Sequence, residues 1–141
     1  MGLRAFTRHA VEKELTLRDN YRRLRILYNR IMLFGAHPYY SYYSYWAAHE
    51  FQTSLGPRRF VCTTVYPDPD TEKEFMEFYY MKDGQYLFKM VCNREHFSFI
   101  GKYEGLEMTE DEAWLAIHEL EELSYKELEV FNDKRTNLWI D

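Results

Sequence analysis

Residues 39–46 carry the side chains best suited to binding another molecule, since five tyrosines and a tryptophan are separated there only by serine. Rigid aromatic rings give a large contact area at low entropic cost, and serine hydroxyls make adaptable hydrogen bonds. The rings can also stack on nucleobases. The alternative is that some rings pack in the core, where every buried tyrosine hydroxyl needs a partner. We expect a partner-binding surface made of Tyr39, Tyr40, Tyr42, Tyr43, Tyr45 and Trp46.

A group of arginines in the first part of the chain has the chemistry to bind phosphate groups. Arg18, Arg22 and Arg25 are spaced so that a helix places them on one face. Phosphate contacts dominate the affinity of proteins for nucleic acids. The competing interpretation pairs this helix with an acidic C-terminal helix, and a pI near 5.6 argues against a general nucleic-acid binder. The candidate nucleic-acid-binding residues are Arg18, Arg22, Arg23, Arg25 and Arg30.

Residue patterns typical of catalysis are missing from the sequence. His49 and Glu50 are adjacent, but Thr53 stands where the zinc motif His-Glu-x-x-His needs its second histidine. The sequence contains neither a Cys-x-x-Cys pair nor a glycine-rich phosphate loop. We therefore predict no catalytic residue, no metal site and no cofactor, and we favour a protein that is not an enzyme.

The N-terminal part of the chain predicts helices. Its apolar residues follow the spacing of one helical stripe, at Leu17, Tyr21, Leu24, Tyr28 and Ile31. Residues 7–15 form either a shorter leading helix or the start of the same helix. We expect residues 39–55 to be helical too, because a helix gathers the serines and alanines on one side, whereas a strand would have aromatic residues on both faces.

The middle of the chain predicts a four-stranded antiparallel meander. Four segments rich in β-branched and aromatic residues are separated by turn signals, at 59–66, 74–81, 85–92 and 96–103. Asp83-Gly84 is a strong hairpin signal. Thr109 and Glu112 form a capping box that begins an acidic C-terminal helix. Helices on one face of an antiparallel sheet make the α+β class, with the order ααββββα in a single domain, residues 1–141.

Charge is distributed unevenly along the chain. Residues 1–60 contain ten Lys and Arg but four Asp and Glu, a balance of +6, whereas residues 61–141 contain eight and nineteen, a balance of −11. Such a split indicates either an acidic partner for the first half or neutralisation of one half by the other within the fold. It would also suit a homodimer.

The preferred hypothesis is a non-enzymatic binding protein of inhibitor, immunity or adaptor type that engages a protein partner through the Tyr/Ser/Trp-rich surface. No apolar stretch is long enough to span a membrane, and residues 1–4 begin no signal peptide. We therefore expect a cytoplasmic protein with reduced thiols at Cys62 and Cys92. The alternatives are a nucleic-acid-binding protein that uses the arginine-rich helix with aromatic stacking, and a small-ligand or nucleotide-binding protein or enzyme.

Overall fold

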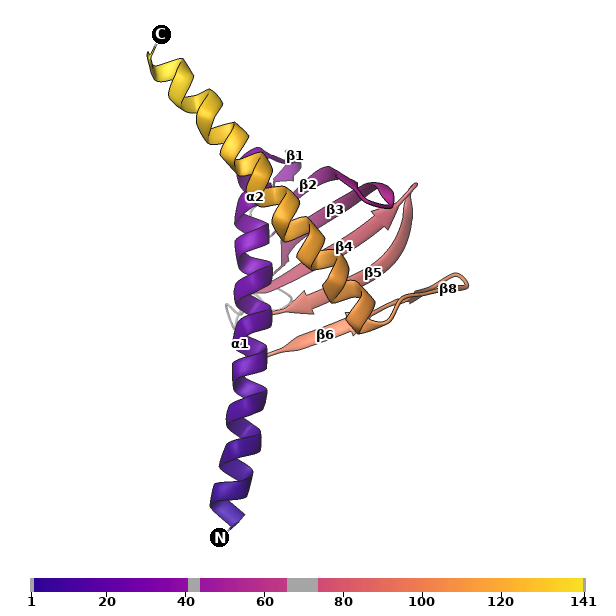
Figure 1. Ribbon diagram of the computed structural model, residues 1–141. Coiled ribbons are helices and arrows are strands. Elements are labelled where there is room, and N and C mark those ends of the chain that lie inside the picture. The colour runs from indigo at the N-terminus through magenta and orange to yellow at the C-terminus, as the bar shows by residue number, and fades with distance from the viewer. Residues whose placement is uncertain (1, 41–43, 66–73, 141) are drawn as a thin grey trace.

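The computed structural model describes residues 2–40, 44–65 and 74–140, which form two long helices and an antiparallel sheet (Figure 1). Helix α1 spans Gly2–Phe34 and helix α2 spans Glu110–Ile140. Between them, six strands form one sheet in chain order: β1 Ala36–Tyr40, β2 Ser44–Thr53, β3 Gly56–Val65, β4 Phe75–Lys82, β5 Gln85–Cys92 and β6 Phe97–Ile100. A separate two-stranded sheet consists of β7 Lys102–Tyr103 and β8 Leu106–Glu107.

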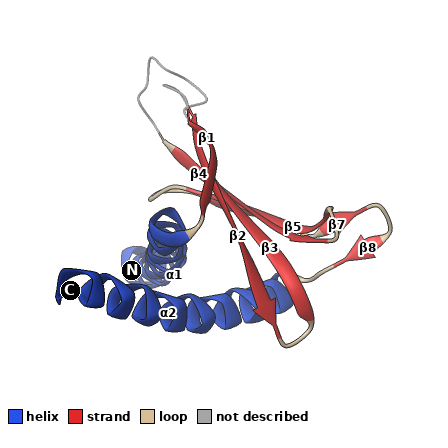
Figure 2. Ribbon diagram, turned by 90° about the horizontal axis from the view of Figure 1, so that it is seen from above, coloured by secondary structure: helices blue, strands red, loops and turns tan. Residues whose placement is uncertain are grey.

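Both helices lie on the same face of the six-stranded sheet and pack against each other there (Figure 1, Figure 2). The N-terminal part of α1 and the C-terminal part of α2 extend beyond the sheet at opposite ends (Figure 1). Strands β1 and β6 form the two edges of the sheet. This arrangement confirms the α+β class, and no helix of the described residues covers the other face of the sheet.

The predicted order ααββββα differs from the structure in one respect. Helix α1 is continuous over 33 residues, which confirms the alternative in which residues 7–15 begin the same helix. The Tyr/Ser/Trp-rich segment is not helical but lies in β1 and β2, which raises the strand number from four to six. The physical reason is cross-strand pairing, because β2 pairs with β3 over its full length, from Ser44 opposite Val65 to Thr53 opposite Gly56. These long-range hydrogen bonds outweigh a weak local preference for helix.

The core lies between the helices and the sheet. The sheet contributes alternate residues of its central strands, namely Phe51, Phe60, Cys62, Phe78, Tyr80, Phe88 and Met90. Each helix contributes one apolar stripe, formed by Leu24, Leu27 and Ile31 in α1 and by Ala113, Ile117 and Leu120 in α2. Full burial of a large apolar side chain contributes about 1.5–3 kcal/mol relative to exposure. This burial fixes which face of each strand is inside, so the intervening residues point to the other face.

Two short sequence signals are confirmed at the ends of elements. Asp83 and Gly84 have positive φ angles of 49° and 79°, as the tight hairpin between β4 and β5 requires. At the start of α2, the Glu112 N–H donates to Thr109 Oγ1 and the Thr109 N–H donates to Glu112 Oε1, both at 3.2 Å. This is the predicted capping box, and it fixes where α2 begins.

Candidate binding surfaces

The sheet face opposite the helices, which we call the open sheet face, combines aromatic, apolar and charged residues. The Thr64 hydroxyl hydrogen-bonds the Tyr28 hydroxyl of α1 at 2.7 Å, so Thr64 points toward the helices and its neighbour Thr63 points away from them. In the strand register, Trp46 of β2 lies opposite Thr63 of β3, and Thr63 lies opposite Glu77 of β4. The three side chains are therefore neighbours on this face. We define the open sheet face as Trp46, Val61, Thr63, Glu77, Tyr79, Tyr86, Lys89, Val91, Ile100 and the adjoining Tyr103.

Three tyrosines pack together on the open sheet face and form a tyrosine cluster. The ring centroids of Tyr79 and Tyr86 are 5.4 Å apart, and those of Tyr86 and Tyr103 are 5.6 Å apart. Burial raises the pKa of Tyr79 and of Tyr103 above the ordinary tyrosine value, and hydrogen bonding to the Glu77 carboxylate raises the pKa of Tyr79 further. These hydroxyls therefore stay protonated at neutral pH and act as hydrogen-bond donors, not as bases.

The charges on the open sheet face compensate each other. Lys89 Nζ lies 3.4 Å from the Glu77 carboxylate and 5.2 Å from the centroid of the Tyr79 ring. The Tyr79 hydroxyl donates to the same carboxylate. Next to the open sheet face, on the same side of β2 and β3, Glu50 lies opposite Arg59. This balance of charge does not attract phosphate groups, which need an excess of Lys and Arg.

One buried hydroxyl on the open sheet face has no hydrogen-bond partner. Thr63 Oγ1 is shielded from solvent and unpaired within the part of the chain that the structure describes. Trp46 and Glu77 flank Thr63 in the register, but neither bonds it. Leaving a buried hydroxyl unpaired costs about 1–3 kcal/mol, and such groups are rare in folded proteins. The open sheet face thus contains a hydrogen-bonding group that the fold itself does not use.

Among the predicted partner-binding residues, Trp46 belongs to the open sheet face. The register of β1 and β2 places Tyr39 opposite Trp46 and Tyr40 opposite Tyr45. Tyr42 and Tyr43 lie outside the described residues. The sequence did not single out the tyrosine cluster, because its three members come from β4, β5 and β7 and only the strand register brings them together.

Two of the predicted nucleic-acid-binding arginines connect α1 with α2. Arg23 makes a forked contact with the Glu121 carboxylate, with Nη2 at 2.6 Å and Nε at 3.2 Å, and its guanidinium lies 4.8 Å from the centroid of Trp114. Arg30 Nη1 donates to the Glu121 carbonyl and to the Ser124 hydroxyl, both at 3.0 Å. Arg23 and Arg30 therefore pair α1 with the acidic helix α2, as the competing interpretation of the arginines expects.

The remaining predicted arginines have other surroundings. Arg18 Nη2 pairs with Glu14 at 2.7 Å within α1, and both side chains are exposed. Arg25 Nη1 lies 3.6 Å from Glu74, next to the start of β4. Arg22 is exposed and has no ion pair with any described residue. The structure therefore divides the five arginines into two that join the helices and three that do not, namely Arg18, Arg22 and Arg25.

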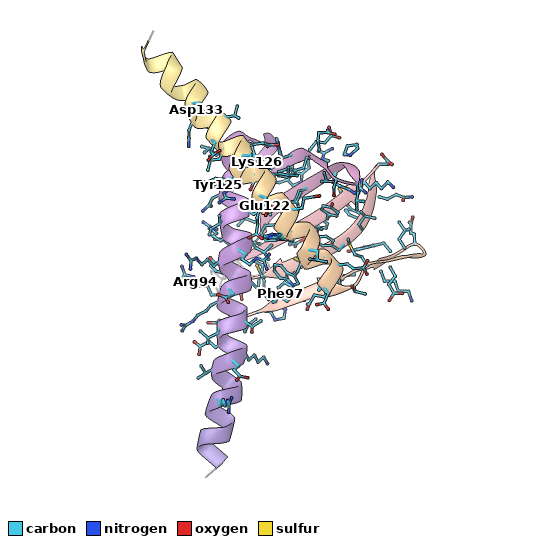
Figure 3. The ribbon with its side chains drawn as sticks, viewed as in Figure 1. Arg94, Phe97, Glu122, Tyr125, Lys126 and Asp133 are labelled. Carbon is cyan, nitrogen blue, oxygen red and sulfur yellow. The ribbon has the colours of Figure 1, made fainter. Side chains whose placement is uncertain are left out.

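Arg94 joins this second group, although the sequence did not single it out. It lies in the turn between β5 and β6, and its guanidinium is 5.8 Å from the centroid of Tyr21 in α1 (Figure 3). The turn could be predicted from the sequence. The contact could not, because nothing local indicates that this end of the sheet meets α1.

His49 links both helices to the sheet. Its Nε2 lies 2.5 Å from the Glu127 carboxylate in α2, and its ring packs edge-on against Phe34 and Phe51 with centroid separations of 5.0 and 4.7 Å. The next residue, Glu50, is on the opposite face of β2, because side chains alternate along a strand. The adjacent His–Glu pair of the sequence therefore does not form one site.

The two cysteines are buried in the core as free thiols. Burial raises the pKa of the Cys62 thiol and raises that of Cys92 to about 12. Both cysteines are thiols at neutral pH and are shielded from solvent, so neither has the properties of a reactive nucleophile.

Within the described parts of the chain, no helix combines the length and the apolar character needed to cross a membrane. In the same residues, no three His, Cys, Asp or Glu side chains are grouped so that they could hold a metal ion. Comparisons of the chain with protein-family models, with curated proteins and with solved structures found no match.

Proposed function

We propose that this protein is a non-enzymatic binding protein whose partner is a protein and whose contact surface is the open sheet face. The observation that supports this most strongly is the one-sided cover of the sheet. Helices α1 and α2 pack on one face of the sheet (Figure 2), while the strand register places Trp46 and the tyrosine cluster on the opposite face. Tryptophan and tyrosine carry much of the binding energy in protein interfaces. The proposal keeps Trp46 from the sequence prediction and adds Tyr79, Tyr86 and Tyr103.

The class of partner follows from the charge and polarity of the open sheet face. Lys89 and Glu77 neutralise each other, and Ile100, which is 48% exposed, adds apolar area. Few uncompensated charges together with aromatic and apolar side chains are typical of the centre of a protein interface. A nucleic-acid surface would carry an excess of Lys and Arg.

The remaining parts of the proposal concern location and competing functions. We place the interaction in the cytosol, because two free thiols are the usual state of cysteine in a reducing compartment. An inhibitor, an immunity protein or an adaptor would use such a surface without catalysis.

A small-ligand site on the open sheet face has less support. The cavity beside Tyr86 and Tyr103 holds about 190 Å³, which is below the usual ligand-pocket volume of about 300–1,000 Å³.

A matched pair of tyrosine truncations tests the proposal. Tyr86 on the open sheet face is 44% exposed, and Tyr125 on α2 is 54% exposed. A partner captured on the wild-type protein should bind Tyr86→Ala more weakly by about 1–3 kcal/mol. Tyr125→Ala should bind that partner within about twofold of the wild type, because Tyr125 lies on the helix side of the sheet and outside the contact surface. Thermal melts of both variants check that they remain folded.

Two results would contradict the proposal. One is unchanged affinity in Tyr86→Ala, and the other is an equal loss in Tyr86→Ala and Tyr125→Ala. Sedimentation of the wild type shows whether the partner is a second copy of this chain. If it is, the property to measure is self-association and not capture of another protein. Tyr86→Ala should then lose self-association, whereas Tyr125→Ala should keep it.

A further inference from the structure

A cavity between α1 and the β5–β6 turn carries three arginine side chains. Its volume is about 530 Å³, and it is lined by Glu14, Arg18, Tyr21, Arg22 and Arg94. A second cavity of about 470 Å³ adjoins it, because both share Tyr21 and Arg94. None of their lining residues belongs to the open sheet face. These cavities therefore form a separate candidate site.

The β5–β6 turn holds Arg94 in place opposite α1. The Asn93 N–H donates to the His96 carbonyl at 2.9 Å, and Asn93 Oδ1 accepts from the Glu95 N–H at 2.8 Å. These two hydrogen bonds fix the turn on both sides of Arg94. The guanidinium then lies 5.8 Å from the centroid of the Tyr21 ring. The turn thus fixes the backbone position of Arg94 beside α1, while its exposed side chain reaches the Tyr21 ring.

The arginines of the first cavity outnumber its carboxylates. Glu14 is its one acidic residue, and it pairs with Arg18 at 2.7 Å. Both side chains of this pair are exposed, so the pair contributes no more than about 1 kcal/mol and can open for a stronger anion. Arg22 and Arg94 have no ion pair within the described part of the chain. The cavity therefore carries an excess of positive charge in a protein whose net charge is −5.

We propose that this cavity binds a phosphate group, with Arg22 and Arg94 as the main ligands and Arg18 as a third. A guanidinium presents its N–H donors in a fixed fork that matches phosphate oxygens. The adjoining cavity is also lined by Asn93, whose Oδ1 accepts from the Glu95 N–H and keeps a second lone pair for a sugar hydroxyl, and by the Tyr21 ring, which offers a face for a nucleobase. The ligand is therefore a phosphate ester of a nucleoside, either free or within a single-stranded nucleic acid. This site does not depend on the function proposed for the open sheet face.

Fluorescence anisotropy with labelled single-stranded RNA and DNA measures this site directly. The variant Arg22→Gln with Arg94→Gln should bind more than about tenfold more weakly at about 50 mM salt, because it removes two charged donors. The control replaces Arg59, an exposed arginine of β3, by Gln, which removes one of these charges far from the cavity, and its affinity should stay within about twofold of the wild type. Thermal melts should be unchanged in both variants, because the substituted side chains are exposed.

Competition by inorganic phosphate and by adenosine monophosphate identifies the source of the phosphate. Competition by either compound indicates a free phosphate ligand. Binding of the oligonucleotide alone indicates a strand, and the double variant should then reduce the slope of log affinity against log salt by about 1.4. The inference is overturned if the wild type binds none of these probes at about 50 mM salt, or if Arg59→Gln loses as much affinity as the double variant. Tyr86→Ala should bind phosphate normally, which separates this test from that of the open sheet face.

Discussion

Two adjacent threonines in β3 have opposite roles. The Thr64 hydroxyl points toward α1 and is paired with the Tyr28 hydroxyl, whereas Thr63 Oγ1 points to the open sheet face and is unpaired. The fold is stabilised by the first hydroxyl and destabilised by the second. Residues that lower stability in this way are often retained for function. We interpret Thr63 as such a residue beneath the partner-binding surface, where its hydroxyl is shielded from solvent.

Replacing each threonine by valine tests this interpretation, because valine keeps the branched shape and removes only the hydroxyl. Thr63→Val should raise the free energy of unfolding by about 1 kcal/mol, since it removes an unsatisfied buried group. Thr64→Val should lower it by about 1 kcal/mol, since it leaves the Tyr28 hydroxyl unpaired. Urea unfolding curves measure both changes. A loss of stability in Thr63→Val would show that its hydroxyl has a partner after all.

At the scale of elements, helix α2 is held by contacts of several kinds. An apolar stripe around Ile117 packs into the core, Glu121 receives the fork of Arg23, and Glu127 contacts His49 on β2. The polar contacts come from both α1 and the sheet, so they fix the position of α2 along its axis as well as its distance from the core. Glu121 and Glu127 belong to the acidic second half of the chain, so part of its acidic excess is used in contacts within the fold.

Neighbouring glutamates of α2 allow a controlled test of this docking. The side chain of Glu121 is 23% exposed and pairs with Arg23, whereas that of Glu122 is 64% exposed and lies 3.2 Å from His118. Glu121→Gln should lower the free energy of unfolding by about 1–2 kcal/mol, because a charge-assisted forked contact is lost. Glu122→Gln should change it by less than about 0.5 kcal/mol. Chemical denaturation compares the two, and equal effects would refute the specific role of Glu121.

The elements that could be predicted from the sequence are those with local signals. The β4–β5 hairpin has its Asp83-Gly84 turn, and α2 has its capping box at Thr109. By contrast, β2 was mistaken for a helix, because its serine and alanine spacing also suits a helical period and its pairing partner β3 lies further along the chain. The candidate sites were predicted only in part for the same reason, since the sequence singled out Trp46, Arg18 and Arg22 but not their neighbours. Tyr86 and Arg94 acquire their neighbours only from strand register and from the contact between the sheet and α1.

At the scale of the whole molecule, proton binding by buried groups links stability to pH. The pKa values of several buried tyrosines and of both cysteines are raised, mainly by burial, namely Tyr28, Tyr79, Tyr80, Cys62 and Cys92. In the unfolded chain the thiols and phenols would lose their protons near their ordinary pKa values of 9.0 and 10.0. Above these values the unfolded state binds fewer protons than the folded state, so stability falls as pH rises.

The melting temperature should therefore be nearly constant between about pH 7 and 8 and should fall progressively above about pH 9. Calorimetry across this range measures the fall, and ultraviolet absorbance of tyrosinate shows which side chains ionise late. Tyr79→Phe is the matched variant, because it removes one delayed ionisation and should flatten part of the decline above about pH 10. A melting temperature independent of pH up to about 10.5 would contradict the account.

The edges of the sheet decide how a partner can approach it. Strand β1 contains Pro38, which has no N–H to donate, and its pairing with β2 shifts register between Ala36 and Tyr39. The opposite edge, β6, is only four residues long. Irregular and short edges resist the strand-by-strand addition that leads to fibrils and other aggregates. The chain can therefore display an aromatic sheet surface without polymerising. A partner must bind that surface through side-chain contacts and not by adding a strand to the edge of the sheet.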